Sequence, residues 1–179
     1  MGPIASYREF AGRIFRAAAR ESCLWAIAWR PSIPFPAAVH DVTKAHRRLL
    51  NHRAIPAERI VFAGGSAGGG LALAALVQLR DFSVPLPVAA MCVSRLTDLA
   101  KESESTRTKA HLDPIVSYEA GMANARRYVG EGGDLKHPIA SPLYAELAGL
   151  PPLLILVGTS ETLLDDSTTS LSRRQPPAF

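Results

Sequence analysis

The chain has 179 residues, 47% of them hydrophobic and 20% charged, with a formal net charge of +4. This length fits one domain, and the composition is typical of a globular core and excludes an intrinsically disordered chain. The longest apolar stretch is too short to cross a bilayer, and the N-terminus has neither the basic nor the apolar region of a signal peptide. We therefore predict a cytoplasmic protein with no membrane span.

Several classes of partner are not expected from the sequence. The basic residues are scattered and do not form a stripe with aromatic residues, which argues against nucleic acid. Cys23 and Cys92 lie in apolar runs that favour buried free thiols. The histidines lack metal-ligand spacing, so we predict no metal and no cofactor. Since His40, His46 and His52 lie six residues apart, they do not share a helix face, and we expect them to be solvated.

The first half of the chain alternates helical and strand-like segments. Apolar residues recur at helical spacing over residues 7–18, and the apolar run at 23–29 is typical of a buried parallel strand. Pro36 opens a second helix, because proline is tolerated in a first turn. A β-branched strand follows at 60–63, and the helix at 71–79 is apolar all round, which predicts burial.

The second half continues this alternation. A strand is predicted at 88–93, a polar segment with a helix at 115–129 follows it, and the last strand is expected at 153–157. Strands that alternate with helices in this order are typical of a parallel sheet joined by crossover helices. The fold class is therefore predicted to be α/β.

The most informative motif lies between the strand at 60–63 and the helix that follows. Gly64, Ser66 and Gly68 have the G-x-S-x-G spacing of a nucleophile elbow, a sharp strand-to-helix turn that strains the serine backbone and favours glycine on both sides. The helix that follows points N–H groups at a developing oxyanion. The pattern predicts acyl transfer, with Ser66 as nucleophile and the Ala67 N–H as an oxyanion donor. The elbow glycines are Gly64, Gly65, Gly68 and Gly69.

Phosphate binding is the other common use of a glycine-rich turn between a strand and a helix. A P-loop would place Lys-Ser or Lys-Thr after its last glycine, but Leu71 and Ala72 follow Gly70. The stretch also contains no G-x-G-x-x-G. The sequence therefore favours the nucleophile elbow.

From about Gly2 to Ser170 the chain resembles the hormone-sensitive-lipase-like, GDXG-type branch of the α/β-hydrolases, bacterial carboxylesterases in particular. Gly65 stands where that family usually has aspartate, and residues 94–98 resemble a Ser-Pro-Trp-x-Asp segment with the proline lost. The resemblance implies a parallel-sheet α/β-hydrolase core and hydrolysis of short to medium acyl esters. Around the elbow it is carried by Ile60, Phe62, Ala63, Gly64, Ser66, Ala67, Gly68, Gly69, Leu71 and Ala72.

By this resemblance, Glu161 holds the place of the triad acid. An acid in the loop just past the strand at 153–157 faces the same edge of the sheet as the elbow. Asp165 is the alternative acid, and the acids at 161–166 are also consistent with an ordinary helix N-terminus. Triad order in this fold is serine, acid, histidine, and no histidine follows Glu161.

Relatives also carry a His-Gly-Gly-Gly oxyanion loop upstream, and Met1 looks like an internal methionine of such a protein. We therefore expect residues 1–179 to form a single partial α/β-hydrolase domain that lacks the first strands, the oxyanion loop and the C-terminal histidine region. Residues 100–148 are a candidate insertion near the cap. The expected function is a serine ester hydrolase that is inactive as given. The alternatives are a non-catalytic fragment, an acyl-ligand-binding scaffold, or an unrelated small-molecule-binding α/β domain.

Overall fold

A three-stranded parallel sheet forms the centre of the molecule. The computed structural model describes residues 8–9, 11–14, 16 and 35–172. The strands, in spatial order, are β1 (Val61–Gly65), β2 (Ala89–Val93) and β3 (Leu153–Leu156). Gly65 pairs with Val93, and Val93 pairs with Leu156, so the three strands end at one level. The three strands predicted within the described region are confirmed.

The N-terminal predictions fall mostly outside the described residues. The strand predicted at 23–29 lies wholly outside them. Of the helix predicted at 7–18, residues 8–9, 11–14 and 16 are described, and all of these are helical.

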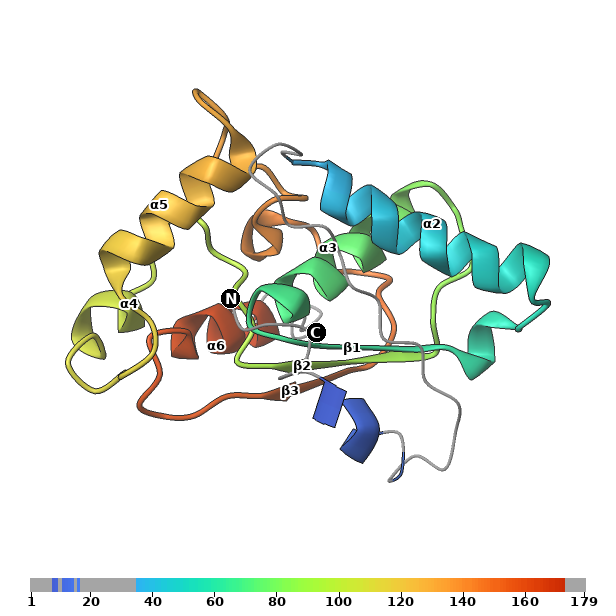
Figure 1. The fold of residues 1–179 in the computed structure, drawn as a ribbon, viewed down its shortest axis with the longest axis horizontal. Coiled ribbons are helices and arrows are strands. Elements are labelled where there is room, and N and C mark those ends of the chain that lie inside the picture. The colour runs from blue at the N-terminus through green and yellow to red at the C-terminus, as the bar shows by residue number, and fades with distance from the viewer. Residues whose placement is uncertain (1–7, 10, 15, 17–34, 173–179) are drawn as a thin grey trace, which may run out of the picture.

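Two helices cover one face of the sheet (Figure 1). Helix α3 (Ala67–Asp81) is the crossover between β1 and β2, and α2 (Ala37–His52) packs against it. Leu73 and Leu76 of α3 are fully buried in a cluster with Ala90 of β2. Burial continues around most of α3 beyond its first turn, which confirms the prediction of a buried helix.

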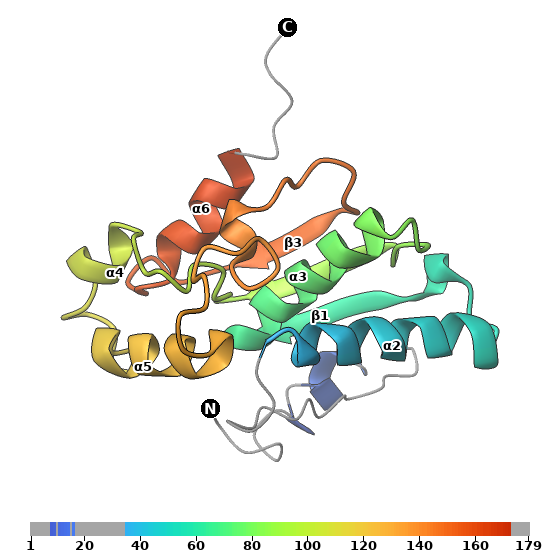
Figure 2. The same cartoon turned by 90° about the horizontal axis from the view of Figure 1, so that it is seen from above.

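The remaining helices gather near the carboxyl ends of the strands. Figures 1 and 2 show α4 and α5 beyond the end of the sheet at which α3 begins. The elements are α4 (Ser105–Thr108), α5 (Tyr118–Val129) and α6 (Leu164–Ser172), with the short 3-10 turn η2 (Pro142–Tyr144). A second 3-10 turn, η1 (Ala57–Arg59), lies at the opposite end of the sheet, directly before β1. Most of segment 100–148 therefore lies on the same side of the molecule as the elbow.

Helix α5 begins three residues later than the sequence predicts. The Asp113 carboxylate accepts hydrogen bonds from the Ile115 and Val116 N–H groups, both at 3.0 Å, which fixes a turn in place of the first helical turn. Ser117 then caps the helix by accepting a backbone N–H bond at 3.2 Å. Hydrogen bonds between local side chains and the backbone therefore place the start of α5 three residues later than predicted.

The prediction that His46 is solvated is wrong. His46 is 1% exposed, its Nε2 lies 2.7 Å from the Pro85 carbonyl oxygen, and its ring stands edge-on to Phe62. Burial lowers the pKa of His46, although the hydrogen bond to Pro85 opposes that shift. His46 lies on the inner face of α2, where the Pro85 carbonyl oxygen is the hydrogen-bond partner of its ring. His40 and His52 are exposed, as predicted.

Arg95 is a buried cation in the segment after β2. It is 0% exposed, and its Nη2 donates to the Asp166 and Ser167 carbonyls at 3.3 and 3.2 Å. Its Nε and Nη1 have no hydrogen-bond partner among the residues that the structure describes. Burial lowers the pKa of this guanidinium, while the nearby Cys92 and Asp166 raise it. Burying a charge with unmade hydrogen bonds destabilises a fold.

We therefore expect Arg95→Met to raise the free energy of unfolding by about 1–3 kcal/mol, because an apolar side chain of similar length removes the buried charge. Urea denaturation of the wild type and the variant measures this change. The control is Arg107→Met, at an exposed position on α4, which should change stability by less than about 0.5 kcal/mol. A clear loss of stability in Arg95→Met would contradict the expectation.

Candidate active site

Ser66 occupies a strained turn between a strand and a helix. β1 ends at Gly65 and α3 begins at Ala67, so Ser66 lies at a strand-to-helix turn, where the sequence places it, although both elements come closer to Ser66 than the predicted strand at 60–63 and helix at 71–79. Ser66 has φ 52° and ψ −124°. Such positive φ is uncommon for a residue other than glycine and requires support from the surrounding structure. That support comes from β2 and the segment after it. The Ser66 N–H donates to the Val93 carbonyl at 2.9 Å, and the Ser66 carbonyl accepts from the Leu96 N–H at 3.0 Å.

The glycines around Ser66 differ in what they allow. A Cβ at Gly64 would overlap the Gly68 carbonyl, and a Cβ at Gly70 would overlap the Leu96 carbonyl. A Cβ at Gly68 would meet nothing within 4 Å. The expectation that only glycine fits on either side of the serine therefore holds for Gly64 and is wrong for Gly68.

The N-terminus of α3 presents a free donor beside the serine. Ala67 is the first residue of this 15-residue helix, and its N–H finds no acceptor in the described part of the chain. The Ser66 side chain is exposed and likewise makes no hydrogen bond there. A free N–H at the positive end of a helix dipole suits an oxygen that gains negative charge.

Glu161 lies in the loop after β3 and is held through one oxygen. Its Oε1 accepts hydrogen bonds from the Ser94 hydroxyl and the Gly158 N–H, both at 2.9 Å. Its Oε2 has no hydrogen-bond partner among the described residues. Ser94 itself has φ 45° and donates its N–H to the Leu156 carbonyl at 2.7 Å. The hydrogen bonds to Oε1 therefore orient the carboxylate, while Oε2 can accept a hydrogen bond from another group.

Ser66 and Glu161 lie at the same edge of the sheet. They follow β1 and β3, and the strand between them, β2, ends level with both. Residues 93–96 hydrogen-bond to the Ser66 backbone, and Ser94 among them binds the Glu161 side chain. One short segment thus contacts both loops.

The two other acids near Glu161 are bonded to backbone N–H groups. The Asp165 carboxylate accepts from the Ser105 N–H at 2.7 Å. Asp166 is 1% exposed, and its Oδ2 accepts from the Thr97 and Asp98 N–H groups at 2.6 and 2.9 Å. Burial raises the pKa of Asp166 to about 6, although these two hydrogen bonds oppose the shift. Both acids thus tie α6 and its N-terminal loop to neighbouring segments.

Asp113 links segment 100–148 to the Glu161 loop. Its Oδ2 accepts from the Thr162 N–H at 3.0 Å and from the Thr162 hydroxyl at 2.9 Å. Burial would raise the pKa of Asp113, but its hydrogen bonds hold it below the usual value. Neither the Asp113–Thr162 contact nor the Ser94–Glu161 contact is predicted by the sequence. Ser94 could have been singled out from the sequence, because it is a polar residue that directly follows a strand.

No histidine in the described region forms a hydrogen bond with Ser66 or Glu161. His111 and His137 are exposed, and His46 is buried against Pro85.

The described residues also contain no group of three or more His, Cys, Asp or Glu side chains arranged to hold a metal ion. In the same part of the chain, no helix is long and apolar enough to span a bilayer. Cys92 is buried as a free thiol, as predicted.

Comparison with known proteins identifies the fold and its relatives. A family model described as alpha/beta hydrolase fold matches residues 1–175. An acetyl-hydrolase of Streptomyces hygroscopicus is 47% identical over 137 residues, which are 76% of this chain and 45% of that protein. An esterase of Acinetobacter venetianus is 35% identical over the same shares.

Solved structures agree with these sequence relatives. An esterase of the bacterial hormone-sensitive lipase family superposes with a TM-score of 0.92 and 44% identity, over 97% of this chain and 58% of that one. A protein named EstE5 superposes with the same TM-score and coverage at 42% identity. The chain belongs to the α/β-hydrolase family, in a lineage of esterases. It spans about half the length of the curated relatives it matches.

Proposed function

We propose that this chain carries the nucleophile and acid of a serine carboxylic-ester hydrolase for short to medium acyl esters. Ser66 is the nucleophile, Glu161 is the triad acid, and the Ala67 N–H is one oxyanion donor. The observation that carries the proposal is the turn at Ser66, which has φ 52°. This turn joins the end of β1 to the first residue of α3. This is the context that a G-x-S-x-G motif requires.

The chemistry assigned to these residues is acyl transfer in two steps. The Ser66 hydroxyl oxygen attacks the ester carbonyl carbon, a base takes its proton, and the alcohol leaves with that proton. Water then hydrolyses the acyl-serine and releases the carboxylic acid. During attack the carbonyl oxygen gains negative charge, which the Ala67 N–H stabilises. Glu161 orients the protonated base through its unpaired Oε2, while Ser94 and Gly158 hold Oε1.

The triad base, a histidine that follows the acid in sequence, does not occur within these 179 residues. The last histidine in the sequence is His137, which precedes Glu161. Loss of the triad base leaves about 10³–10⁴-fold acceleration over the uncatalysed reaction, and loss of one oxyanion donor removes about 10²–10³-fold. We therefore propose that the isolated polypeptide hydrolyses esters close to the background rate.

We also propose that segment 100–148 lies beside the bound substrate as part of the region near the cap. The positions of α4 and α5 beyond the strand ends support this assignment. The Asp113–Thr162 contact supports it as well, because it ties the segment to the residue after Glu161.

Chemical rescue tests the proposed roles. Added imidazole should accept the Ser66 proton and raise p-nitrophenyl acetate hydrolysis several-fold above that of Ser66→Ala at the same imidazole concentration, roughly a 1 kcal/mol reduction of the barrier. The Ser66→Ala protein corrects for hydrolysis by imidazole itself. Glu161→Gln should lose most of the rescue, while Asp165→Asn should retain it. Equal rates in wild type and Ser66→Ala would reject Ser66 as nucleophile, and loss in Asp165→Asn alone would move the acid role.

A further inference from the structure

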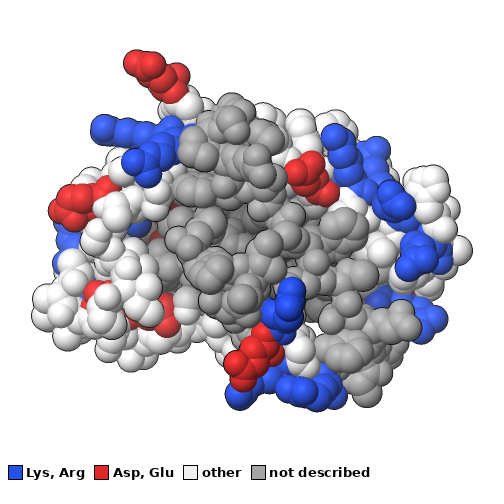
Figure 3. Space-filling view, viewed as in Figure 1, with Lys and Arg blue, Asp and Glu red and all other residues white. Residues whose placement is uncertain are grey.

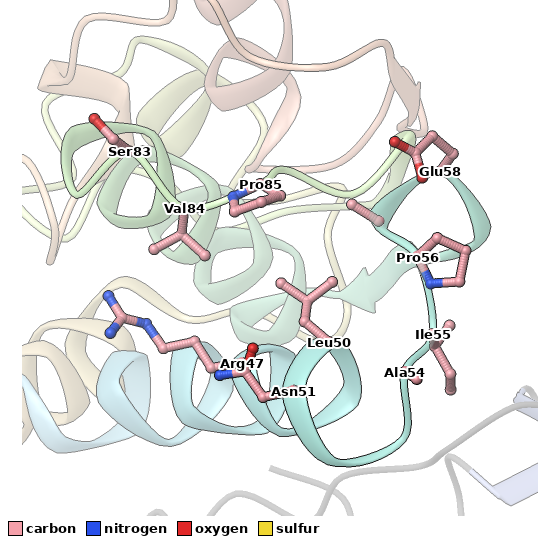
Figure 4. Close-up of a pocket in the computed structure, with 11 residues that line it drawn as sticks. Arg47, Leu50, Asn51, Ala54, Ile55, Pro56, Glu58, Ser83, Val84 and Pro85 are labelled. Carbon is pink, nitrogen blue, oxygen red and sulfur yellow. The ribbon is translucent and has the colours of Figure 1, made fainter.

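A groove runs along α2 at the end of the sheet opposite Ser66. Its main cavity, of about 550 Å³, lies between the C-terminal half of α2 and the loops that precede β1 and β2 (Figure 4). A smaller hollow of about 190 Å³ lies between α2 and the end of α3. Arg47 lines both hollows, which meet at this residue and are together called the groove.

The main cavity has largely aliphatic walls. Leu50 on α2 points toward Pro85 across the cavity, and Ile55, Pro56 and Val84 extend this lining (Figure 4). Apolar walls of this extent suit an alkyl chain, and the volume is within the roughly 300–1,000 Å³ range of small-molecule sites. Exposed aliphatic surface favours a ligand that removes it from water.

The charge at the junction of the two hollows is positive and unpaired. Lys44 and Arg47 line the groove one helical turn apart, and neither forms an ion pair or side-chain hydrogen bond in the described part of the chain. Figure 3 shows Lys and Arg side chains gathered along the side of the molecule where α2 lies. Glu58 lines the groove at the end away from Arg47 (Figure 4). The junction therefore favours a carboxylate.

We propose that this groove binds an amphipathic carboxylate, a free monomeric molecule with one aliphatic chain. Its carboxylate binds the Arg47 guanidinium, whose paired N–H groups match the two oxygens, with the Lys44 ammonium nearby. Its alkyl chain lies in the main cavity against Leu50, Val84 and Pro85. The two parts of the ligand match the two chemically different parts of the groove. The site is independent of the ester chemistry proposed for Ser66.

Calorimetric titration of the full chain with sodium octanoate tests this site. We expect saturable binding to one site, weakened about tenfold by Arg47→Glu, which removes one attraction and adds a repulsion. The matched control is Arg48→Glu, which makes the same charge change at the next residue, outside the groove lining. It should change affinity by less than about twofold. Leu50→Asn should also weaken binding, because it makes the cavity wall polar.

Several results would overturn the proposal. Equal weakening by Arg47→Glu and Arg48→Glu would show non-specific attraction to a basic helix. Equal affinity for 1-octanol would show that the carboxylate is not recognised. Binding that Arg47→Glu leaves unchanged would place octanoate elsewhere, such as the edge that carries Ser66, and absence of saturable binding would reject the site outright. Circular dichroism of each variant confirms that it is folded.

Discussion

Gly70→Ala is expected to lower the free energy of unfolding by about 3 kcal/mol. Gly70 is buried in the first turn of α3, and a Cβ there would overlap the Leu96 carbonyl oxygen. Because that atom belongs to the backbone, no side-chain rotation relieves the overlap. The Leu96 N–H also binds the Ser66 carbonyl at 3.0 Å, so displacement of Leu96 disturbs the turn that holds Ser66.

Gly68→Ala is the matched control in the same helical turn. A Cβ at Gly68 meets nothing within 4 Å, and alanine is favoured over glycine in a helix by about 0.5–1 kcal/mol. We expect this variant to be as stable as the wild type or slightly more stable. Urea denaturation compares the three proteins. Equal stability of Gly70→Ala and the wild type would show that the backbone contact around Ser66 is not tight.

Asp166→Ala is expected to cost about 3 kcal/mol of stability at neutral pH. The carboxylate accepts the Thr97 and Asp98 N–H groups at 2.6 and 2.9 Å, in a site that is 1% exposed. Alanine leaves both donors buried and without this acceptor. Asp166→Asn keeps an acceptor oxygen in place and should lose less stability. Thermal or urea unfolding of both variants measures the difference.

The pH dependence of stability is a second signature of Asp166. Burial raises its folded-state pKa to about 6 from the usual 3.8, against the opposing effect of the Thr97 and Asp98 N–H groups. The Asp98 charge also raises this pKa, and the Lys101 charge lowers it. A raised carboxyl pKa means that the folded state binds the proton more tightly than the unfolded state. The resulting stabilisation is therefore full below about pH 4 and is lost as the pH rises through about 6.

Relative to Asp166→Asn, the wild type should thus gain stability as the pH falls from about 7 to about 4, by up to roughly 3 kcal/mol at 1.4 kcal/mol per pKa unit. The comparison between variants removes the contribution of groups that titrate equally in both proteins. A difference that stays flat across this range, or that grows as the pH rises, would contradict the raised pKa.

The parts of the fold that follow periodicity and turn chemistry were predictable from the sequence. The apolar runs at 60–63, 88–93 and 153–157 correspond to three strands of one parallel sheet. The all-apolar helix after Ser66 is buried. These elements follow from hydrophobic pattern alone, because a strand or helix enclosed on all sides leaves little room for polar residues.

Side-chain contacts between distant segments were not predictable. His46 and Arg95 belong to types that are usually exposed, and only the packing of α2, β2 and α6 buries them. The contact of Ser94 with Glu161 joins residues 67 apart in sequence. The Asx turn at Asp113 moved the start of α5, because a side-chain acceptor competed with the first helical turn.

The hydrolysis rate of p-nitrophenyl acetate, measured without added imidazole for the wild type and Ser66→Ala, tests the central claim most directly. That claim is that the polypeptide holds a nucleophile and an acid but no triad base in reach of them. We predict that both proteins stay near the uncatalysed rate and differ by less than about twofold, since an unassisted serine hydroxyl is a weak nucleophile. A robust wild-type rate that Ser66→Ala abolishes would contradict this account, because it would require a base within these 179 residues.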